Sequence, residues 1–369
     1  MVLMAIDHVR VYSGMPAGGP EPGIFFTRWV THFCAPAFVF LTGTGAFFYA
    51  RKAGAAGAKD GAGALARFLV TRGLLLVLLE LTLIRYCWTF NLDYAKFTLA
   101  GVIWMLGWCM ILLAAFVRLR PLTIGITGLV IIAAQQVFGW LPRVLPAGSR
   151  ATFGRVWEFF YPSGLKGPAG IEILYVLIPW IGVMMAGYGF GLILTTDPAR
   201  RRKLCLRIGL SAIGLFVVAG ILMIVVGPAY EGKLPFVFRL LNQQKYPPSQ
   251  LYVLMTLGPL VALVPFAERA RGWLARVLIL FGRVPLFYYL LHIPLIHLVA
   301  LGVNFWREGS FHQEWYDTAP FTWIEEQHRW GLPLLYGVFI IVEVILYFAC
   351  RWYAGYKAGH PDKKWLRYI

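Results

Sequence analysis

Charged residues are scarce in this chain, and acidic residues are the scarcest of them. Of its 369 residues, only 14% are Asp, Glu, Lys or Arg, whereas 59% are apolar. Soluble globular proteins contain about 25% charged and about 45–50% apolar residues. No compact soluble core would bury this much apolar surface, so the composition excludes a soluble globular protein and predicts a membrane protein.

Cysteine is rare as well. The five cysteines are odd in number and far apart, and the sequence contains no C-x-x-C pair. This spacing indicates neither a disulfide framework nor a zinc site.

The net charge of +17 would suit a protein that binds nucleic acid, but the basic residues lie in loops between apolar runs. We therefore expect no nucleic-acid partner.

Long apolar runs, in contrast, are frequent. About 20 apolar residues span a bilayer as a helix, and nine runs approach this length: 28–50, 68–87, 99–117, 122–141, 171–195, 206–226, 250–267, 275–301 and 332–350. A partial run opens the chain before Asp7, and we interpret it as the outer half of a first helix whose inner half lies upstream of Met1. The predicted fold is all-α: a polytopic integral membrane bundle of about ten transmembrane helices, the first truncated, forming a single domain over residues 1–369.

Positive charge is concentrated in alternate loops. Residues 51–67, 118–121, 196–207, 268–276 and 351–369 carry 19 Lys and Arg against four Asp and Glu. Loops enriched in Lys and Arg stay on the cytosolic side of a membrane. Both termini are therefore predicted to be cytosolic, and the remaining loops face outward.

Few charged residues lie deep inside the predicted spans. Glu80 and Arg283 are near the middle of two different spans. A charge at this depth is costly and marks a candidate functional site, and a buried carboxylate needs a partner. We predict that Glu80 and Arg283 form an ion pair. This pair either holds two helices together or takes part in the function of the protein. Glu343 is also in mid-span, and the sequence suggests no partner for it.

Four histidines lie at one depth, in the outer halves of three helices: His8, His32, His292 and His297. Histidine is the usual general base near neutral pH, so these are candidate catalytic residues, and their common depth predicts that they could form one site. Taken singly, each is more often a packing residue. Metal ligation is the weaker interpretation, because the sequence contains no H-E-x-x-H motif, and we expect no metal.

Helical geometry limits how the neighbours of these histidines can act. Asp7 and Arg10 are three residues apart and share a helix face, whereas Asp7 and His8 point about 100° apart. Pro285 and Pro294 are expected to kink the late helix and free backbone carbonyls near its histidines.

Several segments resemble a bacterial membrane family named after the catalytic domain of heparan-alpha-glucosaminide N-acetyltransferase. The segments that carry this resemblance are LMAIDHVR (3–10), FFTRWVTHFCAPAFVFLTGTGAF (25–47), LLELTLIRYCWTFN (78–91), IPWIGVMMAGYGFG (178–191), KYPPSQLYVLMTLGP (245–259) and FGRVPLFYYLLHIPLIH (281–297). The resemblance implies transfer of an acetyl group from cytosolic acetyl-CoA to a carbohydrate or lipid acceptor on the far side of the membrane.

The wider group of transmembrane acyltransferases commonly has an arginine, ten intervening residues and a histidine on its first helix. His8 falls at that histidine, and the arginine would lie upstream of Met1. The lysosomal enzyme after which the family is named has its catalytic histidine in the loop before its second helix. The matching residues 14–26 of this sequence contain no histidine. His32 lies nearby.

The resemblance implies roles for the polar residues on the outer side. Acyl transfer needs a base to take the proton of the acceptor, and His8 or His32 would serve. The oxyanion that forms needs hydrogen-bond donors, for which Arg10, Asn91 and Tyr288 are candidates.

The phosphates of acetyl-CoA would contact cytosolic cations. Arg72, Arg118 and Arg120 are the candidates, although every cytosolic loop is basic for topological reasons, and no Gly-rich phosphate loop accompanies them. The resemblance places the protein in a bacterial cytoplasmic (inner) membrane, with membrane lipid and a small-molecule or glycan acceptor as partners. A homodimer is one oligomeric state that we consider.

A transporter or lipid flippase is the main alternative, with the intramembrane His, Glu and Arg residues acting as a relay. Transporters often have interrupted helices in two similar halves. Here the only plainly interrupted run contains Pro285 and Pro294, and no second half mirrors it. A non-enzymatic scaffold is favoured least, because charges in mid-membrane would cost it stability.

Overall fold

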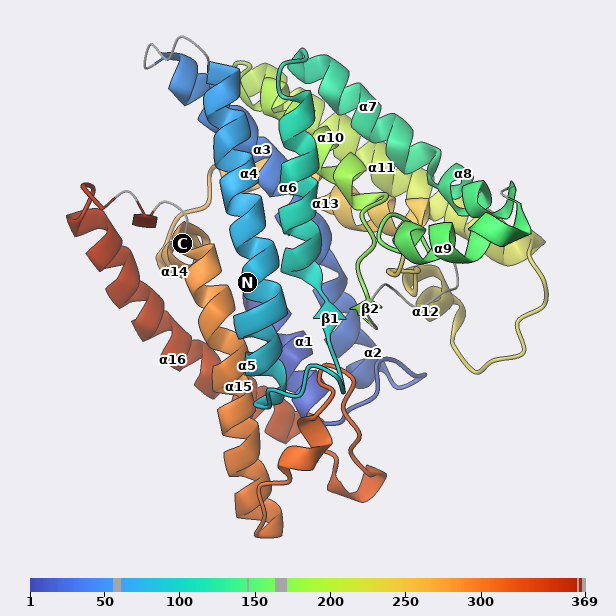
Figure 1. The fold of residues 1–369 in the computed structure, drawn as a ribbon, viewed down its shortest axis with the longest axis vertical. Coiled ribbons are helices and arrows are strands. Elements are labelled where there is room, and N and C mark those ends of the chain that lie inside the picture. The colour runs from blue at the N-terminus through green and yellow to red at the C-terminus, as the bar shows by residue number, and fades with distance from the viewer. Residues whose placement is uncertain (56–60, 145, 163–170, 364, 367–369) are drawn as a thin grey trace.

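The chain folds almost entirely into helices (Figure 1). The computed structural model describes residues 1–55, 61–144, 146–162, 171–363 and 365–366. Within these residues the strands are β1 (Leu99–Ala100) and β2 (Glu172–Ile173), which pair in parallel. Parts of the basic loop 51–67 and of the tail 351–369 lie outside the described residues.

Six helical segments of the described chain are long and apolar enough to cross a membrane. They are Pro22–Gly54, Gly61–Thr89, α11 (Pro198–Val226), α13 (Gln250–Ala267), α15 (Pro285–Glu308) and α16 (Leu332–Gly359). The bent pair Pro121–Ala133 and Gln135–Val144 makes a seventh if it is one span, and α6 (Val102–Phe116) and α10 (Trp180–Leu194) are shorter apolar helices. The protein is therefore a multi-pass helical membrane protein, while the count of ten spans stays a prediction.

The first two of these segments are composite, and the other elements are short. Pro22–Gly54 contains α2 (Pro22–Trp29), η1 (Val30–Phe33) and most of α3 (Cys34–Ala55), and Gly61–Thr89 contains α4 (Gly61–Leu79), the π-helical turn η2 (Glu80–Ile84) and α5 (Arg85–Thr89). The others are α1 (Val2–Tyr12), α7 (Pro121–Ala133), α8 (Gln135–Trp140), η3 (Leu141–Val144), α9 (Ala147–Trp157), α12 (Phe236–Leu241), α14 (Trp273–Arg283), η5 (Gln313–Tyr316) and η6 (Glu326–His328).

Two of the predicted spans contain a marked bend or break. The run 122–141 bends by 57° after α7. The run 275–301 is divided, because α14 ends at Arg283 and α15 begins at Pro285. Proline lacks an N–H and moves the preceding residue away from helical angles, and Val284 accordingly has φ −131° and ψ 52°. Pro294 lies inside α15, which continues past it to Glu308.

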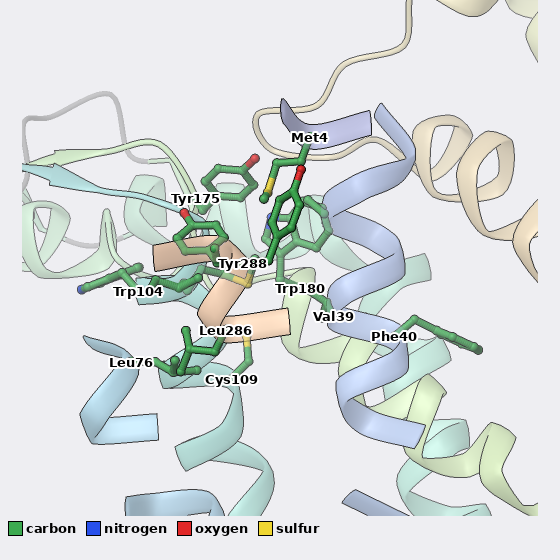
Figure 2. Packing of buried hydrophobic residues seen from close by; sticks show 14 of the residues in the cluster. Met4, Val39, Phe40, Leu76, Trp104, Cys109, Tyr175, Trp180, Leu286 and Tyr288 are labelled. Atoms are coloured by element: carbon green, nitrogen blue, oxygen red, sulfur yellow. The ribbon is translucent and has the colours of Figure 1, made fainter. Parts of the chain in front are cut away.

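Glycine allows the central helices to touch backbone to backbone. A Cβ atom at Gly43 of α3 would collide with the carbonyl of Met184 in α10, and one at Gly187 of α10 would collide with the carbonyl of Phe40. Small residues let membrane helices approach closely, which increases their packing contact. Buried side chains then fill the space towards α1 and α15, among them Met4, Trp180 and Tyr288 (Figure 2).

One end of the bundle is closed by the loops 90–98 and 309–331. Arg85, at the start of α5, is only 2% exposed. Its guanidinium donates to the carbonyls of Phe97, Asn91 and Asp93, the first at 3.1 Å, and packs on the Tyr94 ring at 4.5 Å. Arg85 therefore fixes the loop 90–98 to the end of its own helix.

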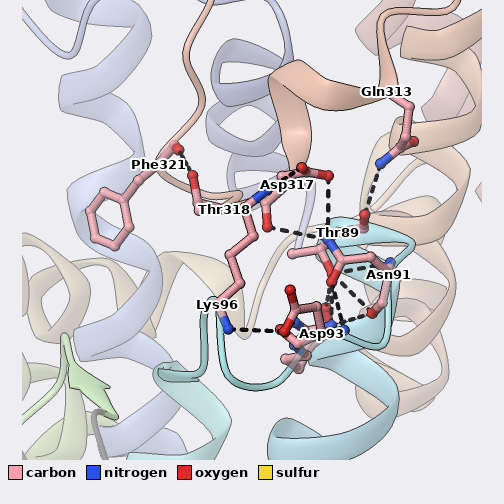
Figure 3. Close-up of polar contacts among 9 residues, drawn as sticks. Thr89, Asn91, Asp93, Lys96, Gln313, Asp317, Thr318 and Phe321 are labelled. Atoms are coloured by element: carbon pink, nitrogen blue, oxygen red, sulfur yellow. Dashed lines mark hydrogen bonds and ion pairs between the residues drawn. The ribbon is translucent and has the colours of Figure 1, made fainter.

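The two loops are joined to each other by polar contacts (Figure 3). Lys96 forms an ion pair with Asp317, and the Asn91 amide donates to the Asp317 carbonyl at 3.3 Å. Gln313 donates to the Thr89 carbonyl at 2.8 Å. This loop-covered end lies over one side of the cavity described below.

Replacement of Gly43 by Ala tests the contact between α3 and α10. The added Cβ meets backbone atoms that no side-chain rotation can move aside, so we expect a loss of about 1–3 kcal/mol in the free energy of unfolding. Gly45→Ala is the matched control, because a Cβ there meets no atom within 4 Å. Thermal unfolding in detergent measures both variants, and equal melting temperatures would contradict the close contact.

Replacement of Arg85 by Gln tests the anchor of the loop 90–98. The variant leaves buried carbonyls without their charged donor, which should cost about 3 kcal/mol of unfolding free energy. It should also free the backbone of the loop, so that trypsin cleaves faster at Lys96, whose side chain is already exposed. Arg283→Gln is the control, because Arg283 is exposed and hydrogen-bonds to no described residue. If both variants lose the same stability and resist trypsin equally, Arg85 is not the anchor.

Candidate active site

A cavity of about 460 Å³ lies between α1, α2, the turn η2 and the beginning of α6. Other walls come from Trp88 of α5, Tyr289 of α15 and the loop segments around Tyr175, Lys245 and Phe321. Its ionisable Asp, Glu, Lys, Arg and His residues are Asp7, His8, Arg10, Arg28, Glu80 and Lys245. Two further cavities hold fewer such residues: one of about 660 Å³ is lined by Arg72, and one of about 20 Å³ by Arg28 and His32.

The helix α1 contributes an ion pair to this cavity. Arg10 Nε lies 2.9 Å from Asp7 Oδ1, and Arg10 Nη1 donates to the Met15 carbonyl at 2.9 Å. The two residues share a face of α1, as their spacing of three predicts. The charge of Asp7 is thus neutralised by a neighbour on its own helix.

His8 is hydrogen-bonded to a second histidine. Its Nδ1 lies 2.7 Å from Nε2 of His292 in α15, and the two rings stack at 4.8 Å. His292 is 0% exposed, and its Nδ1 lies 2.7 Å from the Tyr289 carbonyl and 3.2 Å from the Tyr288 carbonyl. These carbonyls are backbone groups of the preceding turn of α15.

The carbonyls assign the protons in this pair. A carbonyl only accepts hydrogen bonds, so Nδ1 of His292 carries its proton, and Nε2 of a neutral His292 is then an acceptor. His8 Nδ1 must therefore be the donor, and this leaves a lone pair on His8 Nε2. No described residue hydrogen-bonds to that nitrogen, and His8 lines the cavity. The arrangement presents an oriented base to the cavity.

The four histidines do not form one site, which corrects the expectation from their common depth. His32 lines a separate pocket of about 20 Å³ with its Nδ1 3.2 Å from the Arg28 carbonyl. His297 has Nδ1 3.2 Å from the Cys87 carbonyl and Nε2 3.2 Å from Gln313 Oε1, so both nitrogens are used in packing. Depth fixes only the height of a residue in the bundle, and the direction of its side chain follows from helix rotation.

Two of the three expected oxyanion donors are also used elsewhere. Asn91 donates its amide to Asp317 in the loop-covered end. Tyr288 donates its hydroxyl to Glu343, which identifies the partner of that mid-span carboxylate. Neither residue lines the cavity. Arg10 does line it, and its Nη2 makes no hydrogen bond with a described residue.

The predicted ion pair between Glu80 and Arg283 is not present. Arg283 is exposed at the end of α14, while Glu80 is 3% exposed. Glu80 instead accepts from backbone N–H groups of Gly101, Ile103 and Trp104, at the first turn of α6. The N–H groups of a helix start have no partner within the helix and favour a negative charge. Oε2 of Glu80 has no hydrogen-bond partner among the described residues.

The cations expected to contact acetyl-CoA lie apart from this cavity. Arg72 lines a second, largely apolar cavity of about 660 Å³, whereas Arg118 and Arg120 are exposed and line neither cavity. The two cavities have three lining residues in common: Phe38, Val102 and Tyr289. These residues therefore form a thin shared wall between them.

Sequence reasoning missed two cations of the site, Arg28 and Lys245. Arg28 is in FFTRW and Lys245 begins KYPPS, so their place in the family-like segments was the only available signal. Burial lowers the pKa of Lys245, but nearby Tyr246 and the Asp7 carboxylate raise this pKa by more than burial lowers it. The net pKa of Lys245 is therefore above its usual value. Lys245 therefore stays an ammonium ion. In the described chain, no three His, Cys, Asp or Glu residues gather as a metal site.

A family model for the catalytic region of heparan-alpha-glucosaminide N-acetyltransferase matches residues 1–225. No curated protein matches the chain. The matched region contains Asp7, His8, Arg10, Arg28 and Glu80, while the other cavity-lining cation and the partner of His8 follow it. The match covers more than half of the 369 residues. The chain therefore belongs to the heparan-alpha-glucosaminide N-acetyltransferase catalytic family.

Proposed function

We propose that this protein transfers an acetyl group from cytosolic acetyl-CoA to a hydroxyl or amine of a carbohydrate or lipid acceptor on the outer face of a bacterial cytoplasmic membrane. In this proposal residues 1–369 act as one domain with both termini in the cytosol. The observation that carries the proposal is His8 Nε2, an unoccupied nitrogen base on the cavity wall that His292 holds in place. The family match supports acetyl transfer as the chemistry.

The chemistry assigns one role to each histidine. His8 Nε2 takes the proton of the acceptor as its oxygen or nitrogen attacks the thioester carbonyl carbon. The His8 ring then carries a positive charge, and its Nδ1–H donates to His292 Nε2. When the carbon–sulfur bond breaks, the coenzyme A thiolate leaves and His8 returns the proton to it. A positioned base of this kind contributes about 10²- to 10⁴-fold in rate.

Arg10 is the expected oxyanion donor that the geometry retains. It lines the same cavity three residues from Asp7, and its Nη2 is available to the developing negative charge. The second cavity supports a binding place for acetyl-CoA. From there acetyl-CoA would approach the site from the opposite side of the wall formed by Phe38, Val102 and Tyr289. Arg72 on that side would contact a phosphate of acetyl-CoA.

Replacement of His8 by Ala tests the base. The protein is assayed in lipid nanodiscs with radiolabelled acetyl-CoA, and D-glucosamine or the nanodisc lipid serves as acceptor. We expect the rate of acetyl transfer to fall about 10²- to 10⁴-fold. Isothermal titration should show acetyl-CoA binding that is unchanged, because His8 is proposed to contact the acceptor proton. His32→Ala is the matched control and should retain transfer, since His32 lies in a separate pocket. Absence of acetyl-CoA binding to the wild type would reject the proposal.

Replacement of His292 by Phe tests the positioning of His8. The variant keeps a ring in the buried site but removes the acceptor of the His8 Nδ1–H bond. We expect kcat to fall about tenfold to a hundredfold, by analogy with the loss of groups that orient a functional imidazole, while KM changes little. An unchanged kcat with a folded protein would show that the hydrogen bond between His8 and His292 has no catalytic role.

A further inference from the structure

We propose that Arg28 and Lys245 form a subsite for an oxyanion, a phosphate or carboxylate group carried by the acceptor. This inference rests on the proposed function and adds the class of acceptor. Both side chains line the 460 Å³ cavity beside His8. An acceptor anchored there through its anionic group would place a neighbouring hydroxyl or amine at His8 Nε2.

The charges of the cavity are unequally compensated. Asp7 is neutralised by Arg10 at 2.9 Å, and Glu80 uses the backbone of α6 on another wall. Arg28 and Lys245 form no ion pair with any described residue, and both are half-buried. The Arg28 guanidinium hydrogen-bonds to no described residue, whereas Lys245 donates a hydrogen bond to the uncharged hydroxyl of Tyr246. Partly desolvated cations on a low-dielectric wall create a positive potential that attracts an anion.

Lys245 is held in place without being neutralised. It lies in the loop between α12 and α13, where Ser249 N–H donates to the Gln244 carbonyl at 2.9 Å and Lys245 bridges to Pro248. Its Nζ lies 5.1 Å from the Tyr246 ring centroid and 5.9 Å from that of Tyr175. Aromatic faces attract a cation but carry no net charge. The Tyr246 hydroxyl that accepts from Lys245 is uncharged, and the nearby Asp7 carboxylate is already paired with Arg10, so Lys245 keeps a positive charge that a ligand can use.

Arg28 has a fixed backbone, and its guanidinium forms no ion pair or hydrogen bond with the described residues. Its carbonyl, in the last turn of α2, accepts from Thr31 Oγ1 at 2.7 Å and lies 3.2 Å from His32 Nδ1. A guanidinium presents parallel N–H groups that match the two oxygens of a carboxylate or phosphate. Because Arg28 and Lys245 line the same cavity, the guanidinium fork and the ammonium charge would together take one oxyanion.

A phosphate of this kind has two sources, the headgroup of a phospholipid and a soluble phosphorylated molecule. The probe that we choose is sn-glycerol 1-phosphate, which contains the anion and neighbouring hydroxyls. Binding is measured by isothermal titration to the full chain in phosphatidylcholine nanodiscs, with glycerol as the uncharged comparison. We expect glycerol 1-phosphate to bind and glycerol not to bind.

Arg28→Gln and Lys245→Gln remove one charge each without changing size greatly. Each variant should weaken binding of glycerol 1-phosphate by about tenfold or more. The reason is that loss of a charge-assisted hydrogen bond raises the dissociation constant by about tenfold or more. Lys245→Arg should retain binding. Lys233→Gln is the matched control, because Lys233 is an exposed loop cation that does not line the cavity. Unchanged melting temperatures verify that the variants fold.

The outcomes separate this inference from the proposed function, because binding of the probe requires no acetyl-CoA. Equal binding by wild type and both Gln variants, or no preference over glycerol, overturns the subsite. Binding that depends on both cations, without acetyl transfer to any acceptor, supports the subsite and rejects the transferase. Nanodiscs enriched in phosphatidylglycerol distinguish the sources: competition with the probe supports a lipid headgroup, and its absence supports a soluble phosphate.

Discussion

Within an apolar helix bundle, a polar group that finds no partner in the protein costs several kcal/mol, because no water replaces the missing hydrogen bond. The arrangement of this molecule follows from that constraint. Arg85 is surrounded by backbone carbonyls of its own loop, and Tyr288 meets Glu343. Glu80 faces the free N–H groups of α6. Each pairing fixes two segments relative to one another, and the contact of Glu80 with α6 also forms part of the cavity wall.

The polar atoms that remain without a partner on these walls are therefore informative. His8, Glu80, Arg28 and Lys245 line one cavity, and His8 Nε2, Glu80 Oε2 and the Arg28 guanidinium bond to no described residue. Unlike the paired groups, they contribute nothing to joining the helices. A substrate with its own proton, carbonyl and anionic group would satisfy such atoms, which connects the energetics of the fold to the chemistry proposed for it.

Rigidity of the surrounding helices gives this site its geometry. The histidine pair joins α1 to α15, and α15 is turned by the break at Pro285. Backbone contact at Gly43 and Gly187 holds α3 against α10. Because α3 also supplies Phe38 to the wall between the two cavities, the same close packing determines how far apart two bound substrates would lie.

The sequence by itself determined the membrane class, the position of most helices and the family. Apolar runs and loop charges are local properties, so they can be recognised in the sequence without knowing how the helices pack. It also placed Asp7 and Arg10 on a shared face, since this depends on position within one helix. Only the tertiary structure decided that His292 contacts His8 while His32 and His297 do not, that Glu80 meets α6 and not Arg283, and that Lys245 joins the site. The reason is physical: hydropathy records the depth of a residue, whereas its lateral neighbours depend on the rotation and packing of every helix around it.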